Sequence, residues 1–482
     1  MTGAARSMLR SFRDPDGRVV VEAEAVLRFV APHAWQVLER FLASDEGKRR
    51  VDAGEVIATR PCEGAEQNNV RDRHPEDVAA FGGADCVIVR HDRVPFATYP
   101  YEWPPGMLHA AGRLTIALHA SLLADGYGLK DATPFNVLFR GPDPVLIDVL
   151  SIEQREAGDP LWRADAQFLR TFILPLLAYR KLGLAPHERF LASREGWDPA
   201  ALHRALGPLQ RLSPGTFGTV TLPTWLSRSS KADDADFFRE RRMDPDRAAF
   251  TLERNAKSRA GLLNRVAPGA PSATAWTAYE SDLPYDEADH QRKIDFLARA
   301  FADLKPGAVL DMGSNTGRYS LMAAEAGARV VAIDSDPAVA DILWHRARDG
   351  GANVLPLVGN LAAPTPATGW RNMECASLLD RARGQFDMVL ALALFHHLVV
   401  TERVPVADVV GLWAELTRGH AVIEYVDPTD KNFRRISRGR DHLYEGLDVD
   451  TFRTALAAHF EVLEELSLGG GVRVMFRLAK RA

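Results

Sequence analysis

One stretch of this chain, residues 308–335, constrains its fold more than any other. It reads AVLDMGSNTGRYSLMAAEAGARVVAIDS: an apolar run, a turn with two glycines, a helical segment, and a second apolar run that ends on Asp334. A backbone that turns sharply from a strand into a helix, and passes close to a ligand, favours residues without a β-carbon. The stretch therefore predicts a strand, a glycine turn, a helix and a second strand that ends at a carboxylate.

The spacing of the turn residues indicates which ligand such a turn would hold. Asp334 follows the turn by about 20 residues, where a carboxylate can accept both hydroxyls of an adenosine ribose. Dinucleotide-binding enzymes use the spacing G-x-G-x-x-G, whereas this chain has D-x-G-x-N-x-G, with Asp311 at the strand end. Asp311 would repel a pyrophosphate and attract the ammonium group of S-adenosylmethionine (SAM). The residues favour SAM over NAD, and the remaining alternative is a structural turn in some other α/β protein.

The C-terminal part of the chain alternates strands and helices. Strands are expected at residues 308–310, 329–333, 353–358, 385–392, 420–425, 460–466 and 472–478, the last two joined by a glycine turn. In open α/β sheets, ligands bind at the carboxyl ends of the strands. The residues expected to meet there are Asp311, Gly313, Asn315, Gly317 and Asp334 for the cofactor, Asn360 for the adenine edge, and His396, His397 and Glu424 for catalysis.

The catalytic candidates each have a structural alternative. Methyl transfer from a sulfonium is an in-line displacement, so the protein mainly positions donor and acceptor and, for a hydroxyl acceptor, removes a proton. His396 and His397 have intrinsic pKa values near neutrality, but one of two adjacent residues must face away from the site. Glu424 can orient a histidine, bind an acceptor, or only support its neighbours by hydrogen bonding. Trp370 and Glu374 lie in a segment that either covers the acceptor or packs against the protein.

The N-terminal part contains a second ordered set of polar residues. Asp131 and Asn136 stand five apart, and a short hairpin then leads to Asp148. In kinases this order lets the first aspartate accept the substrate proton, while the asparagine and the last aspartate hold magnesium on the nucleotide. Leu129 replaces the usual histidine, Val149 follows the last aspartate, and we find no glycine-rich loop or strand lysine upstream. We therefore expect a degenerate kinase-like scaffold, with Asn136 and Asp148 as metal ligands only if it binds a magnesium nucleotide.

Three other elements are expected in this N-terminal part. Residues 17–29 alternate at first and predict a strand, residues 63–75 are polar and predict a surface loop, and residues 107–125 have the apolar spacing of a long helix.

Length and composition bound the organisation of the chain. At 482 residues it is too long for one core, and residues 268–279, which begin PGAPSA, predict a linker between domains at 1–267 and 280–482. A net charge of −5 gives no overall attraction to nucleic acid, and three widely spaced cysteines suit a reduced, cytoplasmic setting. We see no apolar run that approaches the length of a membrane span. We expect neither a nucleic-acid nor a membrane partner.

The motifs in residues 280–482 resemble those of the class I SAM-dependent methyltransferases. The full chain is similar to one subgroup, the bacterial nodulation-protein-like methyltransferases, through TYPYEW (98–103), LKDA (129–132) with Asn136, LIDVLS (146–151), GWRNME (369–374) and LFHHL (394–398). The resemblance implies an α/β fold in which a Rossmann-like, seven-stranded sheet follows an α+β domain. It also implies methyltransferase activity on an unspecified acceptor. Cys375 stands where this subgroup often has arginine, so substrate contacts can differ.

Three functions remain open from the sequence. The first is a SAM-dependent methyltransferase acting on a small molecule, for instance a sugar or natural-product hydroxyl. The second is a bifunctional or nucleotide-regulated protein whose kinase-like domain binds ATP and magnesium. The third is a SAM-binding module without catalysis. Titration with SAM and with Mg-ATP would separate the first two, and turnover would separate the third.

Overall fold

The computed structural model describes residues 9–229, 242–269 and 287–481. Contacts divide the chain into two compact units, of which unit 1 comprises Met1–Gly269 and Ala367–Ala376, and unit 2 comprises Ala270–Pro366 and Ser377–Ala482. The predicted linker, 268–279, falls almost entirely outside the described residues. Ten residues that the sequence analysis assigns to the C-terminal domain, Ala367–Ala376, thus belong to unit 1 by their contacts.

Unit 2 is built on a seven-stranded sheet with the strand order β12-β11-β10-β13-β14-β16-β15. Its strands are β10 (Ala308–Met312), β11 (Arg329–Asp334), β12 (Val354–Val358), β13 (Phe386–Ala391), β14 (Thr417–Val426), β15 (Phe460–Leu468) and β16 (Arg473–Lys480). β16 is antiparallel to its neighbours β14 and β15, and the other pairs are parallel. The predicted Rossmann-like sheet with a terminal hairpin is confirmed.

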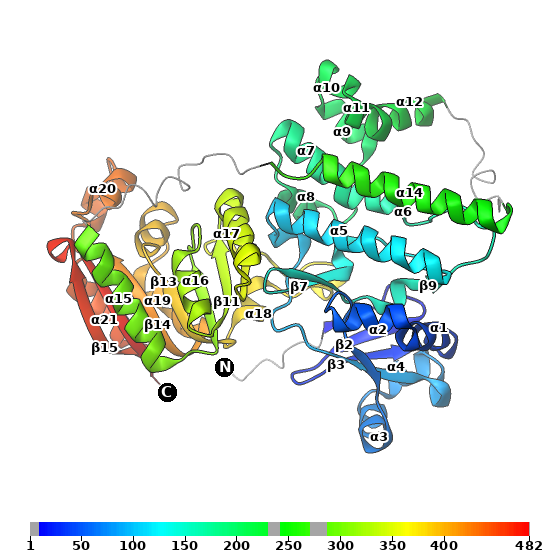
Figure 1. Cartoon of the computed structure of the whole chain (residues 1–482). Coiled ribbons are helices and arrows are strands. Elements are labelled where there is room, and N and C mark those ends of the chain that lie inside the picture. The colour runs from blue at the N-terminus through cyan, green and yellow to red at the C-terminus, as the bar shows by residue number, and fades with distance from the viewer. Residues whose placement is uncertain (1–8, 230–241, 270–286, 482) are drawn as a thin grey trace. The chain divides into compact units, whose positions relative to one another are not determined.

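Helices cover both faces of this sheet (Figure 1). They are α15 (Glu287–Leu304), α16 (Arg318–Glu325), α17 (Pro337–Gly350), α18 (Leu378–Ala382), α19 (Val406–Leu416), α20 (Lys431–Ser437) and α21 (Val449–Ala457). Side chains alternate along a strand, so Val422 of β14 joins the core under α15, α16 and α17, whereas Tyr425 stacks on Phe452 of α21. The sheet is therefore buried on both faces, and its strand ends are left to form a site.

Unit 1 joins an antiparallel sheet to a helical region. Its five-stranded sheet has the order β1-β2-β3-β5-β4, from β1 (Leu9–Arg10), β2 (Gly17–Val21), β3 (Val26–Val30), β4 (Thr59–Pro61) and β5 (Val87–His91). Two small sheets pair β6 (Tyr127–Leu129) with β9 (Ile152–Gln154) and β7 (Val137–Arg140) with β8 (Asp143–Leu146). The hairpin expected before Asp148 is thus present, and unit 1 has the α+β character that the sequence predicts.

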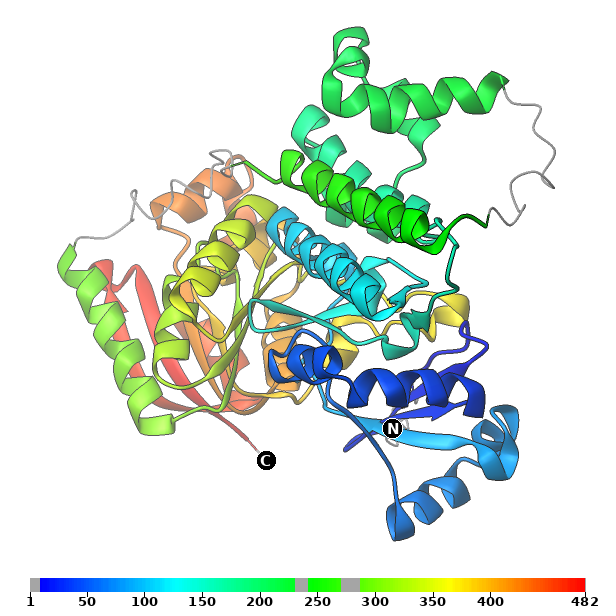
Figure 2. The same cartoon turned by 45° about the vertical axis from the view of Figure 1, so that its right-hand side comes forward.

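The helices of unit 1 follow its strands in the chain. They are α1 (Pro32–Ala43), α2 (Asp45–Asp52), α3 (Gly64–Arg73), α4 (Pro75–Ala80), α5 (Pro105–Leu122), α6 (Asp165–Phe168), α7 (Leu174–Leu182), α8 (Pro186–Ala192), α9 (Pro199–Ala205), α10 (Pro208–Leu212), α11 (Pro214–Thr216), α12 (Leu222–Ser229) and α14 (Pro245–Arg265). Figures 1 and 2 show α5 and α14 side by side. They pack closely at Gly112 of α5, where a β-carbon would lie only 3.2 Å from Leu263 of α14, so glycine permits the contact.

Two features of unit 1 correct expectations from the sequence. The sequence was expected to contain no apolar run of membrane-spanning length, but Pro105–Asp125 is long and apolar enough to cross a membrane by length and composition alone. Most of this helix is buried inside unit 1, as the core helix of a folded domain is. Residues 17–29 form the hairpin of β2 and β3, not one strand, because Glu22 N–H donates to the Ala25 carbonyl across a tight turn.

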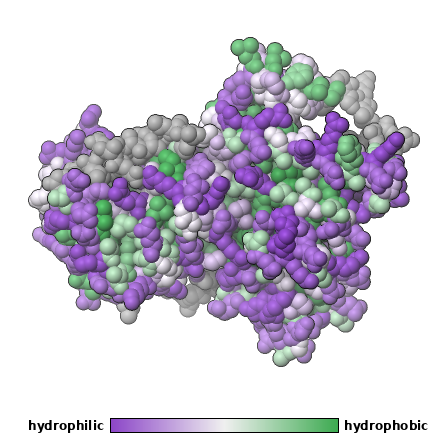
Figure 3. Space-filling view, in the orientation of Figure 1, coloured by the Kyte–Doolittle hydropathy of each residue, from purple (hydrophilic) through white to green (hydrophobic). Residues whose placement is uncertain are grey.

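An apolar surface lies at the end of unit 1 formed by α10 and α12, and Figure 3 shows hydrophobic residues gathered there. Its exposed members are Leu209, Leu212, Leu222, Trp225 and Leu226.

Candidate active site

The turn between β10 and α16 has a backbone that only particular residues allow. Gly313 and Gly317 have φ angles of 74° and 87°, and Asn315, a residue type that tolerates this conformation, has 49°. A β-carbon on Gly317 would lie 2.0 Å from a methyl carbon of Leu343. The Gly313 N–H donates to the carbonyl of Ile333, which ties the turn to β11. The result is a rigid turn whose inner surface is bare backbone.

Two carboxylates, Asp311 buried and Asp334 half-buried, stand at the ends of β10 and β11. Asp311 accepts a hydrogen bond of 2.5 Å from the Ser320 hydroxyl, and burial raises the pKa of Asp311 to about 6 despite that bond. Asp334 accepts backbone N–H groups from Asn315 (2.8 Å) and Asp336 (2.9 Å), one on each oxygen. Burial also raises the pKa of Asp334. Both carboxylates are therefore held in place and respond strongly to a nearby positive charge.

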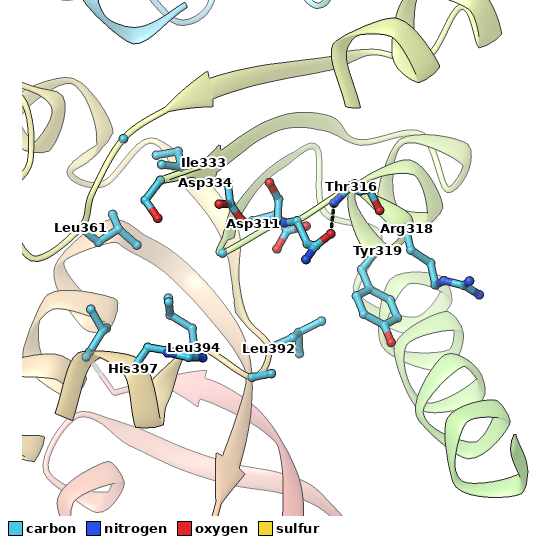
Figure 4. A pocket seen from close by; sticks show the side chains of 18 of the residues that line it. Asp311, Thr316, Arg318, Tyr319, Ile333, Asp334, Leu361, Leu392, Leu394 and His397 are labelled. Carbon is cyan, nitrogen blue, oxygen red and sulfur yellow. Dashed lines mark hydrogen bonds between the residues drawn. The ribbon is translucent and has the colours of Figure 1, made fainter. Parts of the chain in front are cut away.

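The carboxyl ends of β10 to β13 surround one cavity of about 340 Å³ (Figure 4). Seven of the predicted site residues line it, namely Asp311, Gly313, Asn315, Gly317, Asp334, Asn360 and His397. Figure 4 shows Tyr319 and His397 well apart, with Asp311 between them. The structure thus brings the whole predicted cofactor set to one place.

Asn360 has most of its side-chain hydrogen-bonding capacity left. Its side-chain oxygen accepts the backbone N–H of Ala362 at 2.9 Å, which uses one of the two lone pairs of that oxygen. The amide NH₂ can donate to an acceptor atom on a purine, and the oxygen can accept a second hydrogen bond. Asn360 therefore keeps the donor-and-acceptor role toward adenine that the sequence allows.

The two adjacent histidines have different surroundings. His397 lines the cavity, and among the described residues His396 does not. His396 is 1% exposed, and its ring stacks toward Phe433. His397 opens a helical turn, His397–Thr401, wound more loosely than an α-helix. Burial, together with Arg435 and Arg473, lowers the pKa of His397 to about 4. At neutral pH its imidazole is uncharged and faces the site.

Glu424 does not take the catalytic place that the sequence suggests. It is fully buried and accepts hydrogen bonds from Lys293 (2.6 Å) and Arg473 (2.9 Å), while Arg473 also donates to Asp430 (2.9 Å). Burial opposes ionisation, but the two cations lower the pKa of Glu424 to about 2. Among the described residues, those that line the cavity include Lys293 and Arg473 but not Glu424. Glu424 thus pairs with two cations of the cavity wall without lining the cavity itself.

Sequence reasoning missed those two cations. Lys293 and Arg473 line the cavity although Lys293 precedes the first strand of the sheet and Arg473 lies on the last strand in the chain. Lys293 also lies over the ring of Tyr319, 4.9 Å from its centre. One signal was available: Lys293 falls on the helical stripe of Phe296 and Ala300, where a charged residue is unexpected.

These residues fit SAM. The bare turn leaves room for the donor, Asp334 can accept ribose hydroxyls, and Asp311 can attract the ammonium group. Lys293 supplies the positive charge that an α-carboxylate needs. An adenosine ligand with one carboxylate and two positive groups matches this set better than a pyrophosphate, which the two aspartates would repel.

The kinase-like residues of unit 1 have a different arrangement. Asp148 accepts a hydrogen bond of 2.6 Å from Arg28 of β3, and Lys130 donates to Asp16 in the loop between β1 and β2. Burial and the nearby Asp148 raise the pKa of Asp131. Among the described residues no group of three or more His, Cys, Asp or Glu side chains could hold a metal ion.

Arg28 already engages Asp148, and Asn136 supplies no negative charge, so the described side chains present one unpaired carboxylate fewer than the kinase pattern needs for a magnesium nucleotide. No step in the reaction is assigned to these residues.

A methyl donor bound at the strand ends of such a sheet defines a SAM-dependent methyltransferase, and a family model described as "Methyltransferase domain" matches residues 310–418. The cofactor is S-adenosyl-L-methionine. Over 471 residues the chain is 30% identical to the nodulation protein NoeA of Rhizobium meliloti (strain 1021), covering 97% of this chain and 94% of that protein. The chain therefore belongs to the NoeA family.

Solved structures resemble part of the chain. The N-methyltransferase NodS from Bradyrhizobium japonicum WM9 matches 41% of this chain and 99% of its own, at 13% identity and a TM-score of 0.30. The bifunctional kinase-methyltransferase WbdD matches 44% of each chain, at 17% identity and a TM-score of 0.31.

Proposed function

We propose that this chain transfers a methyl group from SAM to a hydroxyl of a small molecule, such as a sugar or another natural product. The observation that carries the proposal is His397, an uncharged imidazole on the cavity wall. A hydroxyl must lose its proton as its oxygen is methylated, and a neutral imidazole has a nitrogen lone pair that can take that proton.

The other residues of the cavity position the two reactants. Bound SAM supplies an electrophilic methyl group on a positively charged sulfur. Asp334 accepts the ribose hydroxyls, Asn360 donates to the adenine edge, and Lys293 attracts the α-carboxylate. Holding the donor and the acceptor hydroxyl in one cavity places the two reacting groups close together.

The proposal includes a cytoplasmic setting, which the cysteines support. Cys62, Cys86 and Cys375 are all buried free thiols, which suits a reducing cytoplasm. Neither nucleic acid nor a membrane takes part in this proposal.

The test uses SAM with a deuterated methyl group. The protein is incubated with it and a small-molecule extract, and products that carry the label are identified by mass spectrometry. We expect the label on an oxygen of a small molecule, strong loss with His397→Asn, and retention with His396→Asn. Label only on nitrogen, only on macromolecules, or on nothing would refute the proposal.

A further inference from the structure

A loop of ten residues, Ala367–Ala376, belongs to unit 1 although the chain on either side of it belongs to unit 2. Its ends pair as an antiparallel bridge between Thr368 and Cys375. Two tyrosines of unit 1 support that base, because Thr368 donates to the Tyr101 hydroxyl and the Ala376 N–H donates to the Tyr99 hydroxyl. The loop is thus anchored at its base.

The loop has a second anchor in Glu374, whose side chain is only 8% exposed. Glu374 accepts from Arg13 at 2.5 Å and lies 3.6 Å from Arg194. It also accepts the backbone N–H of Trp370 at 2.9 Å, which closes the loop on itself. A β-carbon on Gly369 would lie 2.1 Å from the carboxylate, so glycine is needed there.

The tip of the loop is strained and exposed. Arg371 and Asn372 have φ angles of 54° and 58°, a conformation that costs side-chain-bearing residues free energy. Such strain persists only where the surroundings impose it, and it gathers at ligand clamps. Trp370 is nevertheless 65% exposed, and residues 371–373 are exposed as well. The anchors therefore fix the backbone from which a large aromatic side chain projects into solvent.

We propose that this tip, residues 369–374, is a carbohydrate-recognition site that binds the sugar part of the methyl acceptor. An indole face stacks on the CH-rich face of a pyranose ring, and the adjacent Arg371 and Asn372 supply hydrogen-bond donors suited to vicinal hydroxyls. Because the backbone of the tip is already fixed, binding loses little backbone entropy. Glu374 is a positioning residue that acts through Trp370. The proposal rests on the proposed function in one respect only, that the acceptor is a small molecule.

The test measures binding of cellotetraose, a tetrasaccharide with flat ring faces, to the full chain by titration calorimetry. We expect saturable binding that weakens about tenfold in Trp370→Ala and less than about threefold in Trp370→Phe. The matched control is Trp225→Ala, which removes another exposed indole, 47% exposed on α12, and should change nothing.

Two further measurements separate positioning from folding. Glu374→Gln should weaken tetrasaccharide binding and lower the unfolding midpoint modestly, because it breaks the ion pairs with Arg13 and Arg194. The affinity for S-adenosylhomocysteine should stay within error, which shows that the rest of the protein is folded. No saturable tetrasaccharide binding, or equal affinity in wild type and Trp370→Ala, would overturn the proposal. A wild-type dimer that Trp370→Ala converts to a monomer would overturn it too, by assigning the tip to self-association.

The test distinguishes this inference from the proposed function. Methylation of a small-molecule hydroxyl that ignores Trp370→Ala would sink the inference alone. Tetrasaccharide binding through Trp370 without methylation of any small molecule would sink the proposed function and the assignment of the bound sugar to a methyl acceptor, but it would keep the tip as a carbohydrate site.

Discussion

Replacing Glu424 with glutamine removes one negative charge from a fully buried network of four charged side chains. Lys293 and Arg473 balance Glu424 and Asp430 in the native protein. Glutamine keeps the shape of the side chain, but it leaves two buried cations with one carboxylate. We expect the variant to be destabilised strongly, while a catalytic role for Glu424 would instead predict lost turnover in a stable protein.

The magnitude follows from the pKa of Glu424. Burial resists ionisation, but Lys293 and Arg473 hold the pKa at about 2 against an ordinary value of 4.5. That difference corresponds to about 3 kcal/mol of stability. Breaking one side of a buried ion pair typically costs about 3–5 kcal/mol. The two estimates agree, so the free energy of unfolding should fall by about 3 kcal/mol or somewhat more at pH 7.

The assay is urea unfolding of both proteins at pH 7 and at pH 3. Because the folded pKa of Glu424 is depressed, its contribution is fully present above the unfolded pKa of 4.5 and is lost as the pH falls toward about 2. The difference between wild type and Glu424→Gln should therefore shrink at pH 3. Equal stability at pH 7 combined with lost methyl transfer would refute this reasoning and restore Glu424 as a catalytic residue.

Four other predictions concern ligands. Asp334→Asn should weaken S-adenosylhomocysteine binding roughly ten- to a hundredfold in calorimetry, because a charge-assisted hydrogen bond is lost; the exposed Asp349→Asn is the control, and equal affinities would contradict the assignment. His397→Asn should lower kcat about a hundredfold. At saturating SAM, wild-type kcat should stay level as the pH falls until it drops near 4, where the His397 imidazole gains its proton, while protonation of Asp311 near pH 6 should raise only the KM for SAM; a drop in kcat at saturating SAM near pH 6.5 would argue against this base. Lys293→Met should weaken S-adenosylhomocysteine but not methylthioadenosine, which has no carboxylate, and an equal loss for both ligands would point to misfolding of the cavity. Mg-ATP should give no saturable heat, since Arg28 already holds Asp148; saturable binding would revive the nucleotide-binding alternative.

The strands of unit 2 could be predicted because they are buried on both faces. Every residue of β10 and of β12 is buried, so these strands appear in the sequence as apolar runs between turn signals, interrupted in β10 only by the site residue Asp311. The predicted range 353–358 differs from β12 by one residue. The signal is local, and the order of the strands in the sheet then follows from the family resemblance.

Elements of unit 1 that depend on distant partners could not be predicted this way. Residues 63–75 were expected to form a loop, but α3 (Gly64–Arg73) occupies most of that range. The helix is polar nearly all around, so it lacks the apolar periodicity that indicates a helix. Ion pairs of Glu66 with Arg60 and Arg90, outside the helix, hold it in place. Such pairs join residues up to 24 positions apart and leave no local pattern.

The site residues also fall into two groups, those whose positions the sequence predicts and those whose positions it does not. The cofactor residues from Asp311 to Asp334 sit on one strand-turn-helix-strand unit, so their spacing in the sequence already places them together. Which histidine faces the cavity depends instead on Ala393, whose φ of 53° turns the chain after β13, and on the loose helical turn that starts at His397. An alanine gives no sign of that conformation in the sequence.

The charges around the cavity explain why a sulfonium donor suits it better than its product. Lys293 and Arg473 are balanced by Glu424 and Asp430, so these four side chains add no net charge. Of the other charged side chains that line the cavity in the described part of the chain, the three carboxylates of Asp311, Asp334 and Glu402 outnumber the one cation, Arg318. Asp311, with a pKa of about 6, is mostly ionised at pH 7. SAM carries one net positive charge and S-adenosylhomocysteine carries none. Attraction between the aspartates and the donor is therefore lost with the methyl group, which favours release of the product once His397 has taken the acceptor proton.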